Sequence, residues 1–178
     1  MRVIAGKYKG RRLVSPADSS IRPTGDKVKG ALFSVIAEKV PGGRILDLFS
    51  GTGNLGIEAL SRGASSCVFA DRSPAGIRII KENIAHCRIE EEVRVYPGDF
   101  RKVLMNQRKP FDVILLDPPY DAGAMDECFR IIREQELLAE GGIIVAEHGK
   151  REELPERFHG FTKEKDRKYG VAVLSIYS

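Results

Sequence analysis

Residues 44–56 read RILDLFSGTGNLG, and this stretch decides the fold. A short apolar run ends in an acid, a glycine-rich loop follows, and a helical pattern begins within the loop. Gly51, Gly53 and Gly56 match G-x-G-x-x-G, a spacing that lets the backbone turn tightly and approach a ligand closely. The N-terminus of the following helix offers free N–H groups. A strand, a glycine loop and a helix in this order are typical of an α/β sheet that binds a ligand beyond its strand ends.

The same order of strand and helix repeats along the chain. The strands are continuous apolar runs, and the links between elements are short, which favours a parallel sheet covered by helices on both faces. The expected strands are 44–49, 67–71, 93–99, 111–117 and 141–148, and the expected helices are 54–63, 74–87, 100–107, 122–138 and a short one around 150–157.

Both ends of the chain depart from this alternation of strands and helices. Residues 161–170 and 171–178 are strand-like and too close together for a crossover helix, so they should pair antiparallel at one edge. Near the start, 2–5 and 11–14 suggest a hairpin, and 26–39 has helical spacing despite Gly30, which costs about 1 kcal/mol relative to alanine. The expected fold is an α/β sheet of about seven strands, mostly parallel with an antiparallel edge, in residues 41–178. A small basic N-terminal hairpin and helix, residues 1–40, should pack on it.

Composition narrows the class of protein. The chain has 178 residues, of which 42% are hydrophobic and 30% charged, as expected for a soluble globular protein. No apolar run is long enough to span a bilayer, and the first residues do not resemble a secretory signal. Cys67, Cys87 and Cys128 lie far apart and form no CxxC pair, which favours buried, reduced thiols, a cytoplasmic location and no metal site.

Positive charge is concentrated at the N-terminus. Residues 1–30 hold eight Lys or Arg and two acids, whereas the other 148 residues carry a net charge of −2. A basic arm on a nearly neutral body favours a polyanionic partner such as nucleic acid. The alternative is a solvated basic hairpin with no partner.

An acid closes each of the first three expected strands, at Asp47, Asp71 and Asp99. Asp71 lies 20 residues after Gly51, which also fits the ribose-binding acid of a dinucleotide fold. Asp47, however, would repel a pyrophosphate and would suit a ligand with a positive amino group. S-adenosylmethionine has an ammonium, a sulfonium, a ribose diol and no phosphate. Strand-end acids also occur simply because turns favour Asp.

On the S-adenosylmethionine interpretation, each acid has a role. Asp47 would lie near the methionine end, Asp71 would accept from the ribose hydroxyls, and Asp99 would accept from the adenine amino group beside Phe100. The expected cofactor contacts are Asp47, Phe49, Ser50, Gly51, Thr52, Gly53, Asp71, Arg72, Asp99 and Phe100.

The fourth strand ends in DPPY, residues 117–120. An exocyclic amino group of a nucleobase is a poor nucleophile, because its lone pair is delocalised into the ring. Two acceptors aimed at its N–H bonds favour the tetrahedral form that attacks a methyl group. Asp117 would supply one acceptor and the carbonyl of Pro118 the other, with Pro118 and Pro119 fixing the direction of the backbone. Tyr120 would stack on the base. DPPY could otherwise be a plain strand terminator.

DLFSGTG and DPPY together resemble the Rossmann-like, S-adenosylmethionine-dependent methyltransferases that modify amino nitrogens. A closer resemblance, over nearly the whole chain, is to the bacterial 16S ribosomal RNA guanine-N2 methyltransferases. It is carried by RVIAGKYKGRRL, IRPTGDKVKGALFSVI, LDLFSGTGNLGIEALSRGA, LLDPPY and RKYGVAVLSIYS. One departure is Gly30, where that family usually has Glu.

The resemblance implies N2 methylation of a guanine in small-subunit ribosomal RNA. Because the sequence shows no wide recognition domain, we expect the RNA to be held within a small-subunit particle, and we expect a monomer. It places the methionine and ribose contacts around Asp47, Ser50–Gly53 and Asp71, and the target amino group at 117–120. The arm would grip phosphates through Arg2, Lys7, Lys9, Arg11, Arg12 and Arg22. The alternatives are an amino methyltransferase acting on DNA adenine or protein glutamine, an NAD-binding oxidoreductase, and a non-catalytic RNA-binding protein.

Overall fold

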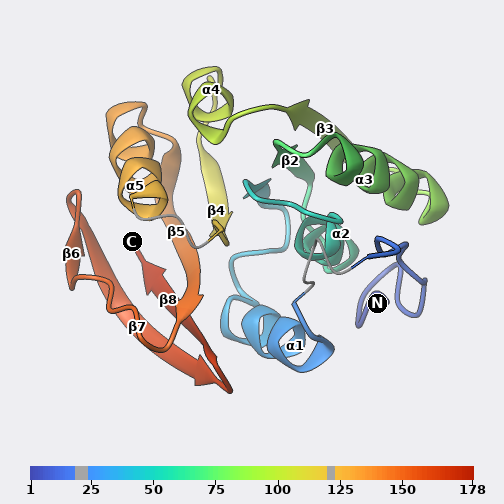
Figure 1. Ribbon diagram of the computed structural model, residues 1–178, viewed down its shortest axis with the longest axis horizontal. Coiled ribbons are helices and arrows are strands. Elements are labelled where there is room, and N and C mark those ends of the chain that lie inside the picture. Colours follow the sequence, from blue (N-terminus) through green and yellow to red (C-terminus); the bar gives the residue numbers. More distant parts are fainter. Residues whose placement is uncertain (19–23, 120–122) are drawn as a thin grey trace.

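The computed structural model describes residues 1–18, 24–119 and 123–178, and it contains one eight-stranded sheet (Figure 1). The strand order is β3-β2-β1-β4-β5-β8-β7-β6. The strands are β1 Arg44–Asp47, β2 Ser66–Asp71, β3 Glu92–Pro97, β4 Phe111–Leu116, β5 Leu138–Gly149, β6 Arg157–Phe158, β7 Phe161–Tyr169 and β8 Ala172–Tyr177. Strands β1 to β5 run parallel, whereas β8, β7 and β6 continue the sheet in antiparallel pairs.

Strand β1 lies between β2 and β4, so the order of connection reverses beside it. Open α/β sheets bind their ligands at such a switch point, beyond the carboxyl ends of the strands. Asp47 is the last residue of β1, and Asp117 directly follows β4. The topology therefore brings the ends of the glycine-loop strand and the DPPY strand together.

Helices cover both faces of the sheet, as Figure 1 shows. One apolar cluster joins α1, α2 and α3 to one face, and a second joins α4 and α5 to the other. The opposite faces of β4 divide accordingly, with Val113 and Leu115 in the first cluster and Ile114 and Leu116 in the second. The helices are α1 Asp26–Val35, α2 Asn54–Ser61, α3 Pro74–His86, α4 Phe100–Met105 and α5 Ala124–Glu134.

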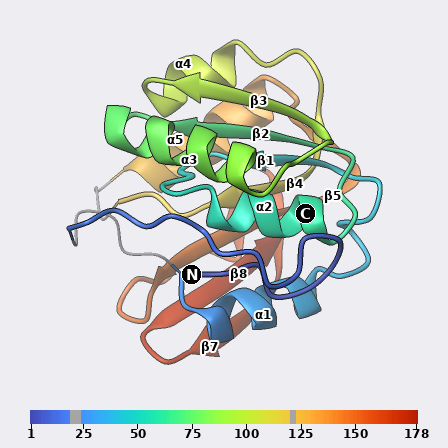
Figure 2. The same cartoon turned by 90° about the vertical axis from the view of Figure 1, so that its right-hand side faces the viewer.

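The N-terminal segment packs along α2 (Figure 2). An antiparallel bridge joins Arg2 to Arg12, and the backbone N–H of Lys7 donates to the carbonyl of Ser61 at 2.8 Å. A Cβ on Gly6 would lie 1.9 Å from that carbonyl oxygen, so only glycine allows this approach. Val3, Tyr8 and Leu13 are buried in the cluster of α1 to α3. The segment is therefore part of the packed core.

The strand–helix alternation and the antiparallel tail are confirmed. The sheet has eight strands rather than about seven, because the two-residue β6 extends it beyond β7. Helix α1 ends at Val35 rather than near residue 39. The predicted N-terminal hairpin is present as a short antiparallel pairing, with a bridge between Arg2 and Arg12 and backbone hydrogen bonds from Val3 to Arg11 and from Leu13 to Met1.

The predicted short helix around residues 150–157 is wrong. That segment is a turn followed by extended chain that enters β6. Pro155 has no backbone N–H to donate, and its carbonyl accepts instead from the hydroxyl of Tyr177 at 2.7 Å. The carbonyl of Leu154 accepts from the Nζ of Lys163 at 2.7 Å, and the Leu154 side chain is buried. Side-chain contacts with β7 and β8 thus hold the segment extended.

Cys67, Cys87 and Cys128 are buried and free, as predicted. Across residues 1–18, 24–119 and 123–178, no helix has the length and apolar character needed to cross a membrane.

Candidate active site

A cavity of about 580 Å³ lies at the carboxyl ends of the parallel strands. Its volume falls within the range of small-molecule sites. It is lined by Thr24, Asp47, Leu48, Phe49, Ser50, Gly51, Thr52, Asn54, Leu55, Asp71, Arg72, Ser73, Gly98, Asp99, Phe100, Arg101, Asp117, Pro118, Pro119 and Ala124. The cavity brings the glycine loop, the strand-end acids and the first three residues of DPPY into one site.

Asp71 holds the glycine loop in place. Its Oδ2 accepts from the backbone N–H of Gly51 at 2.9 Å, and its Oδ1 accepts from that of Ser73 at 2.8 Å. Ser73 in turn caps α3 by accepting from the backbone N–H of Gly76. The predicted ribose acceptor therefore has a structural role as well, and each of its oxygens retains a lone pair that could face a ligand.

Gly53 and Gly56 are needed for backbone conformation and close packing rather than for lining the cavity. Gly53 precedes α2 with φ 81°, a conformation that favours glycine, and it does not line the cavity, unlike the other predicted cofactor contacts. A Cβ on Gly56 would lie 2.3 Å from Cε1 of Phe69, so this glycine allows α2 to pack closely on β2. The third glycine of the pattern is needed for helix–strand contact.

Asp47 is almost wholly buried, with 3% of its surface exposed. Its Oδ2 accepts from the backbone N–H of Gly56 at 2.9 Å. Burial raises the pKa of Asp47 to about 7, and the nearby charges of Asp117 and Asp71 act in the same direction, although the Gly56 hydrogen bond opposes them. A cationic group bound beside Asp47 would favour its ionised form.

Asp99 caps α4. Its Oδ1 accepts from the backbone N–H of Arg101 at 2.9 Å, and its Oδ2 lies 2.9 Å from Nη1 of the same residue. Phe100 packs against Phe49 with ring centroids 5.5 Å apart, and the Arg101 guanidinium lies over the Phe100 ring. These rings give the cavity an apolar wall at the place predicted for adenine.

Asp117, Pro118 and Pro119 line the other end of the cavity. Asp117 is open to solvent there, yet the surrounding protein removes enough water to raise its pKa to about 6. Tyr120, the predicted stacking residue, lies outside the described residues.

Glu147 was not predicted from the sequence. Leu116 pairs with Ala146 across β4 and β5, so Glu147, which lies within β5, is beside Asp117, which directly follows β4. Burial and then the charge of Asp117 raise the pKa of Glu147 to about 7, whereas a hydrogen bond from the Thr24 side chain lowers it. Its Oε2 is buried and has no hydrogen-bond partner in the described part of the chain. Because Glu147 lies inside β5, the rule that strand ends carry site residues does not find it, and its place beside Asp117 follows from the register of β4 and β5.

Thr24, Asn54, Ser73 and Arg101 also line the cavity and were missed. Asn54 directly follows Gly53, and Ser73 and Arg101 each come two residues after a strand-end acid, which is a usable signal in the sequence. Thr24 has no such signal, because it reaches the cavity only through the packing of the N-terminal segment.

The basic residues of the arm differ in their surroundings, since some are engaged by other residues and others are exposed. Nζ of Lys7 lies 2.7 Å from Oε2 of Glu90 and 3.3 Å from Oε1 of Glu91, and the hydrogen bond to Glu90 is the main cause of its raised pKa. Arg11 donates to the carbonyl of Cys87 and lies over the ring of Tyr8.

Arg2 pairs with Asp26 at 3.6 Å, whereas Arg12 and Lys9 are exposed. Arg22 falls in a part of the chain that the structure does not describe. Within the described ranges, no three or more His, Cys, Asp or Glu side chains form a group that could hold a metal ion.

Comparison with known proteins assigns the chain to a family. A family model described as Conserved hypothetical protein 95 matches residues 1–178. The chain belongs to this family. Two proteins similar to this chain are "Putative rRNA methyltransferase YlbH" of Bacillus subtilis and "Ribosomal RNA small subunit methyltransferase D" of Haemophilus influenzae. They are 42% and 31% identical, over 99% of this chain and 98% and 93% of their own lengths.

Solved structures agree with the family assignment. "Putative methyltransferase yhhF from Escherichia coli" superposes with a TM-score of 0.87 at 26% identity, covering 99% of this chain and 96% of its own. The predicted Rossmann-like methyltransferase fold is thereby confirmed.

Proposed function

We propose that this protein transfers a methyl group from S-adenosylmethionine to the N2 amino group of a guanine in small-subunit ribosomal RNA. One observation carries the proposal: a single cavity runs from the glycine loop to Asp117 and Pro118. Its two ends match a methyl donor and an amine acceptor. The full-length relatives named as ribosomal RNA methyltransferases support the coarser statement, an S-adenosylmethionine-dependent enzyme acting on ribosomal RNA.

The donor end fits the charge of the cofactor. Asp47 and Asp71 place carboxylates in the cavity, and Asp47 is a buried acid that a bound cation would stabilise in its ionised form. S-adenosylmethionine supplies an electrophilic methyl group on a sulfonium and brings an ammonium, a ribose diol and an adenine. Asp47 would hold the ammonium, Asp71 the ribose, and the wall of Phe49 and Phe100 the adenine. A dinucleotide pyrophosphate would meet the carboxylate of Asp47 instead.

The acceptor end orients an amine. Asp117 and the carbonyl of Pro118 would accept the two N–H bonds of the amino group and so favour a tetrahedral nitrogen with an available lone pair. Catalysis here is largely a matter of positioning and of stabilising the positive charge that develops on that nitrogen. The ionised carboxylate of Asp117 contributes both to positioning the amine and to stabilising its developing charge. It is also an available acceptor for the released proton. Stacking of the base on Tyr120 completes the proposal.

The structure of the RNA around the target guanine is limited by how the amino group can reach the cavity. A guanine within a duplex cannot turn its amino group toward the cavity, so the target is a loop or extruded nucleotide. We infer that residues 1–40 form the RNA-binding unit and residues 41–178 the catalytic domain. The proposed substrate is ribosomal RNA held in an assembled small-subunit particle, and the proposed enzyme acts as a cytoplasmic monomer.

The test is transfer of labelled methyl from S-adenosylmethionine to naked small-subunit RNA, to small-subunit particles, to duplex DNA and to release-factor protein. Digestion of the RNA should yield labelled N2-methylguanosine. Label confined to DNA or protein would refute the ribosomal assignment, and label in another nucleoside would refute the N2 assignment. Thermal shift should show stabilisation by S-adenosylhomocysteine and none by NAD.

A further inference from the structure

A second cavity of about 610 Å³ adjoins the active site. It is lined by Met1, Arg2, Gly10, Arg12, Leu13, Thr24, Gly25 and Asp26. Thr24 lines both cavities, and its side chain is hydrogen-bonded to Glu147, so the two cavities adjoin near Asp117. A polymer whose base enters the first cavity would have to pass close to the second.

Two guanidinium groups stand at this second cavity. The antiparallel bridge between Arg2 and Arg12 places them on paired backbone positions. Arg12 is exposed and makes no ion pair with any described residue, and Arg2 has only a long, exposed pair with Asp26 at 3.6 Å. A guanidinium presents a planar fork of N–H donors that matches two oxygens of one phosphate. The cavity wall is therefore suited to a phosphodiester.

Other basic residues of the arm are already engaged elsewhere. Lys7 is held by Glu90 and Glu91, and Arg11 by the Cys87 carbonyl and the Tyr8 ring. None of these residues lines either cavity. Lys9 is exposed and lines neither cavity, so among the described basic residues of the arm only Arg2 and Arg12 line the second cavity.

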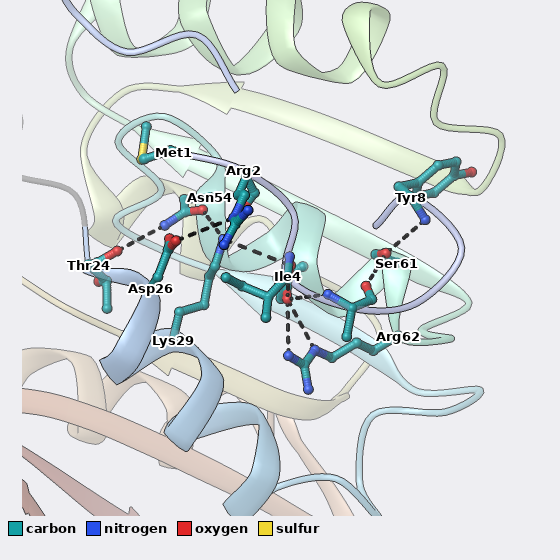
Figure 3. Close-up of polar contacts among 12 residues, drawn as sticks. Met1, Arg2, Ile4, Tyr8, Thr24, Asp26, Lys29, Asn54, Ser61 and Arg62 are labelled. Atoms are coloured by element: carbon teal, nitrogen blue, oxygen red, sulfur yellow. Dashed lines mark hydrogen bonds and ion pairs between the residues drawn. The ribbon is translucent and has the colours of Figure 1, made fainter. Parts of the chain in front are cut away.

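The wall between the two cavities is held by a buried network, drawn in Figure 3. Nζ of Lys29 donates to the carbonyl of Arg2 at 2.6 Å and to Oδ1 of Asn54 at 2.7 Å. Nδ2 of Asn54 donates to the carbonyl of Thr24 at 3.3 Å. Because Asn54 itself lines the first cavity, the same residues fix Arg2 and Thr24 relative to the glycine loop.

We propose that the second cavity binds the sugar–phosphate backbone of the nucleotide adjoining the methylated guanine, with Arg12 and Arg2 holding its phosphate. This proposal rests on the proposed function. An extruded base leaves its flanking phosphates beside the mouth of the pocket that receives it. In this arrangement the first cavity orients the amino group, and the second cavity determines the path of the RNA strand.

Charge-neutralising variants test the assignment. Arg12→Gln should raise the KM for RNA roughly tenfold and reduce the slope of log affinity against log salt by about one. The value of kcat at saturating RNA and the affinity for S-adenosylhomocysteine should not change. Arg157→Gln is the matched control, because it removes the same charge from an exposed position on β6, at the far edge of the sheet. Lys7→Gln should raise KM less than Arg12→Gln.

A modified RNA makes the test specific to one contact. Replacing the phosphate on one side of the methylated guanine by a methylphosphonate should weaken binding to the wild-type enzyme and have a much smaller effect on Arg12→Gln. Equal effects on both enzymes at both flanking phosphates would overturn the proposal, as would equal KM values for Arg12→Gln and Arg157→Gln. Failure of the wild-type enzyme to methylate any guanine would instead overturn the proposed function.

Discussion

Nζ of Lys29 lies 2.7 Å from Oδ1 of Asn54, so a wholly buried ammonium in α1 is joined to the first residue of α2. Burial lowers the pKa of Lys29, and the carboxylate of Glu58, 3.8 Å away, partly offsets this effect. Glu58 is itself fully buried and accepts from the backbone N–H groups of Ile4 and Ala5. This network ties the N-terminal segment and α1 to the helix that carries the glycine loop.

Lys29→Ala should destabilise the protein by about 3 kcal/mol or more, because removing one partner leaves the buried charge of Glu58 less compensated. The measurement is the free energy of unfolding from denaturant titration. Lys27→Ala, at an exposed position of the same helix, is the control. Equal unfolding free energies for the two variants would contradict a structural role for the network.

Gly30→Ala should stabilise the protein by about 0.5–1 kcal/mol, because alanine restricts the unfolded chain and favours the helix. A Cβ at Gly30 meets nothing within 4 Å. Gly56→Ala provides the contrast in α2, since its Cβ would collide with the ring of Phe69. Thermal unfolding of both variants should show shifts of opposite sign, and a fall in stability for Gly30→Ala would mean that the position is more confined than the structure shows.

Methyl transfer should depend on the ionisation of Asp117. Since burial raises its pKa to about 6, kcat should rise with pH through that region as the carboxylate becomes the stronger acceptor. Glu147 lies beside Asp117 on the neighbouring strand β5, and its pKa is raised to about 7, so the observed values will belong to the pair.

Asp117→Asn should lower kcat by about 10²-fold or more and leave the affinity for S-adenosylhomocysteine within a few-fold. The check is a pH–rate profile at saturating substrates for the variant and for wild type. An unchanged rate in Asp117→Asn would contradict the proposed role of its carboxylate.

Asp47 should make the ligand-free protein less stable as pH rises. Its pKa is about 7 when folded and 3.8 ordinarily, so between these values the folded state binds more protons than the unfolded state. Its contribution to the unfolding free energy therefore falls with rising pH, by up to about 4 kcal/mol. Unfolding free energies compared at about pH 5 and about pH 8 should show a smaller difference in Asp47→Asn.

The same ionisation should favour the cofactor. A bound ammonium pairs with the ionised form of Asp47, so the affinity for S-adenosylhomocysteine should increase as pH rises toward about 7. Calorimetric titration over this range should show the trend in wild type and lose it in Asp47→Asn. A flat profile in wild type would place the ammonium away from Asp47.

Local features of the sequence determined most of the sheet. Continuous apolar runs and glycine loops depend on neighbours in the chain, so the strands around 44–47 and 111–116 and the acids that follow them could be placed without the structure. The same local reasoning failed for residues 150–157, because the bonds that hold Leu154 and Pro155 extended come from β7 and β8. The sequence of residues 150–157 alone does not indicate these bonds.

Amino-acid order alone therefore determined the alternation of strands and helices, the glycine loop and the acids Asp47, Asp71, Asp99 and Asp117. Only the tertiary structure decided that Glu147 stands beside Asp117, that Thr24 lines both cavities, and that Lys7 is bound by Glu90 whereas Arg12 has no ion pair with a described residue. The physical reason is the distance along the sequence over which each effect acts. Periodicity and turn chemistry act over a few residues, whereas charge pairing and burial depend on which distant segments the packed core brings together.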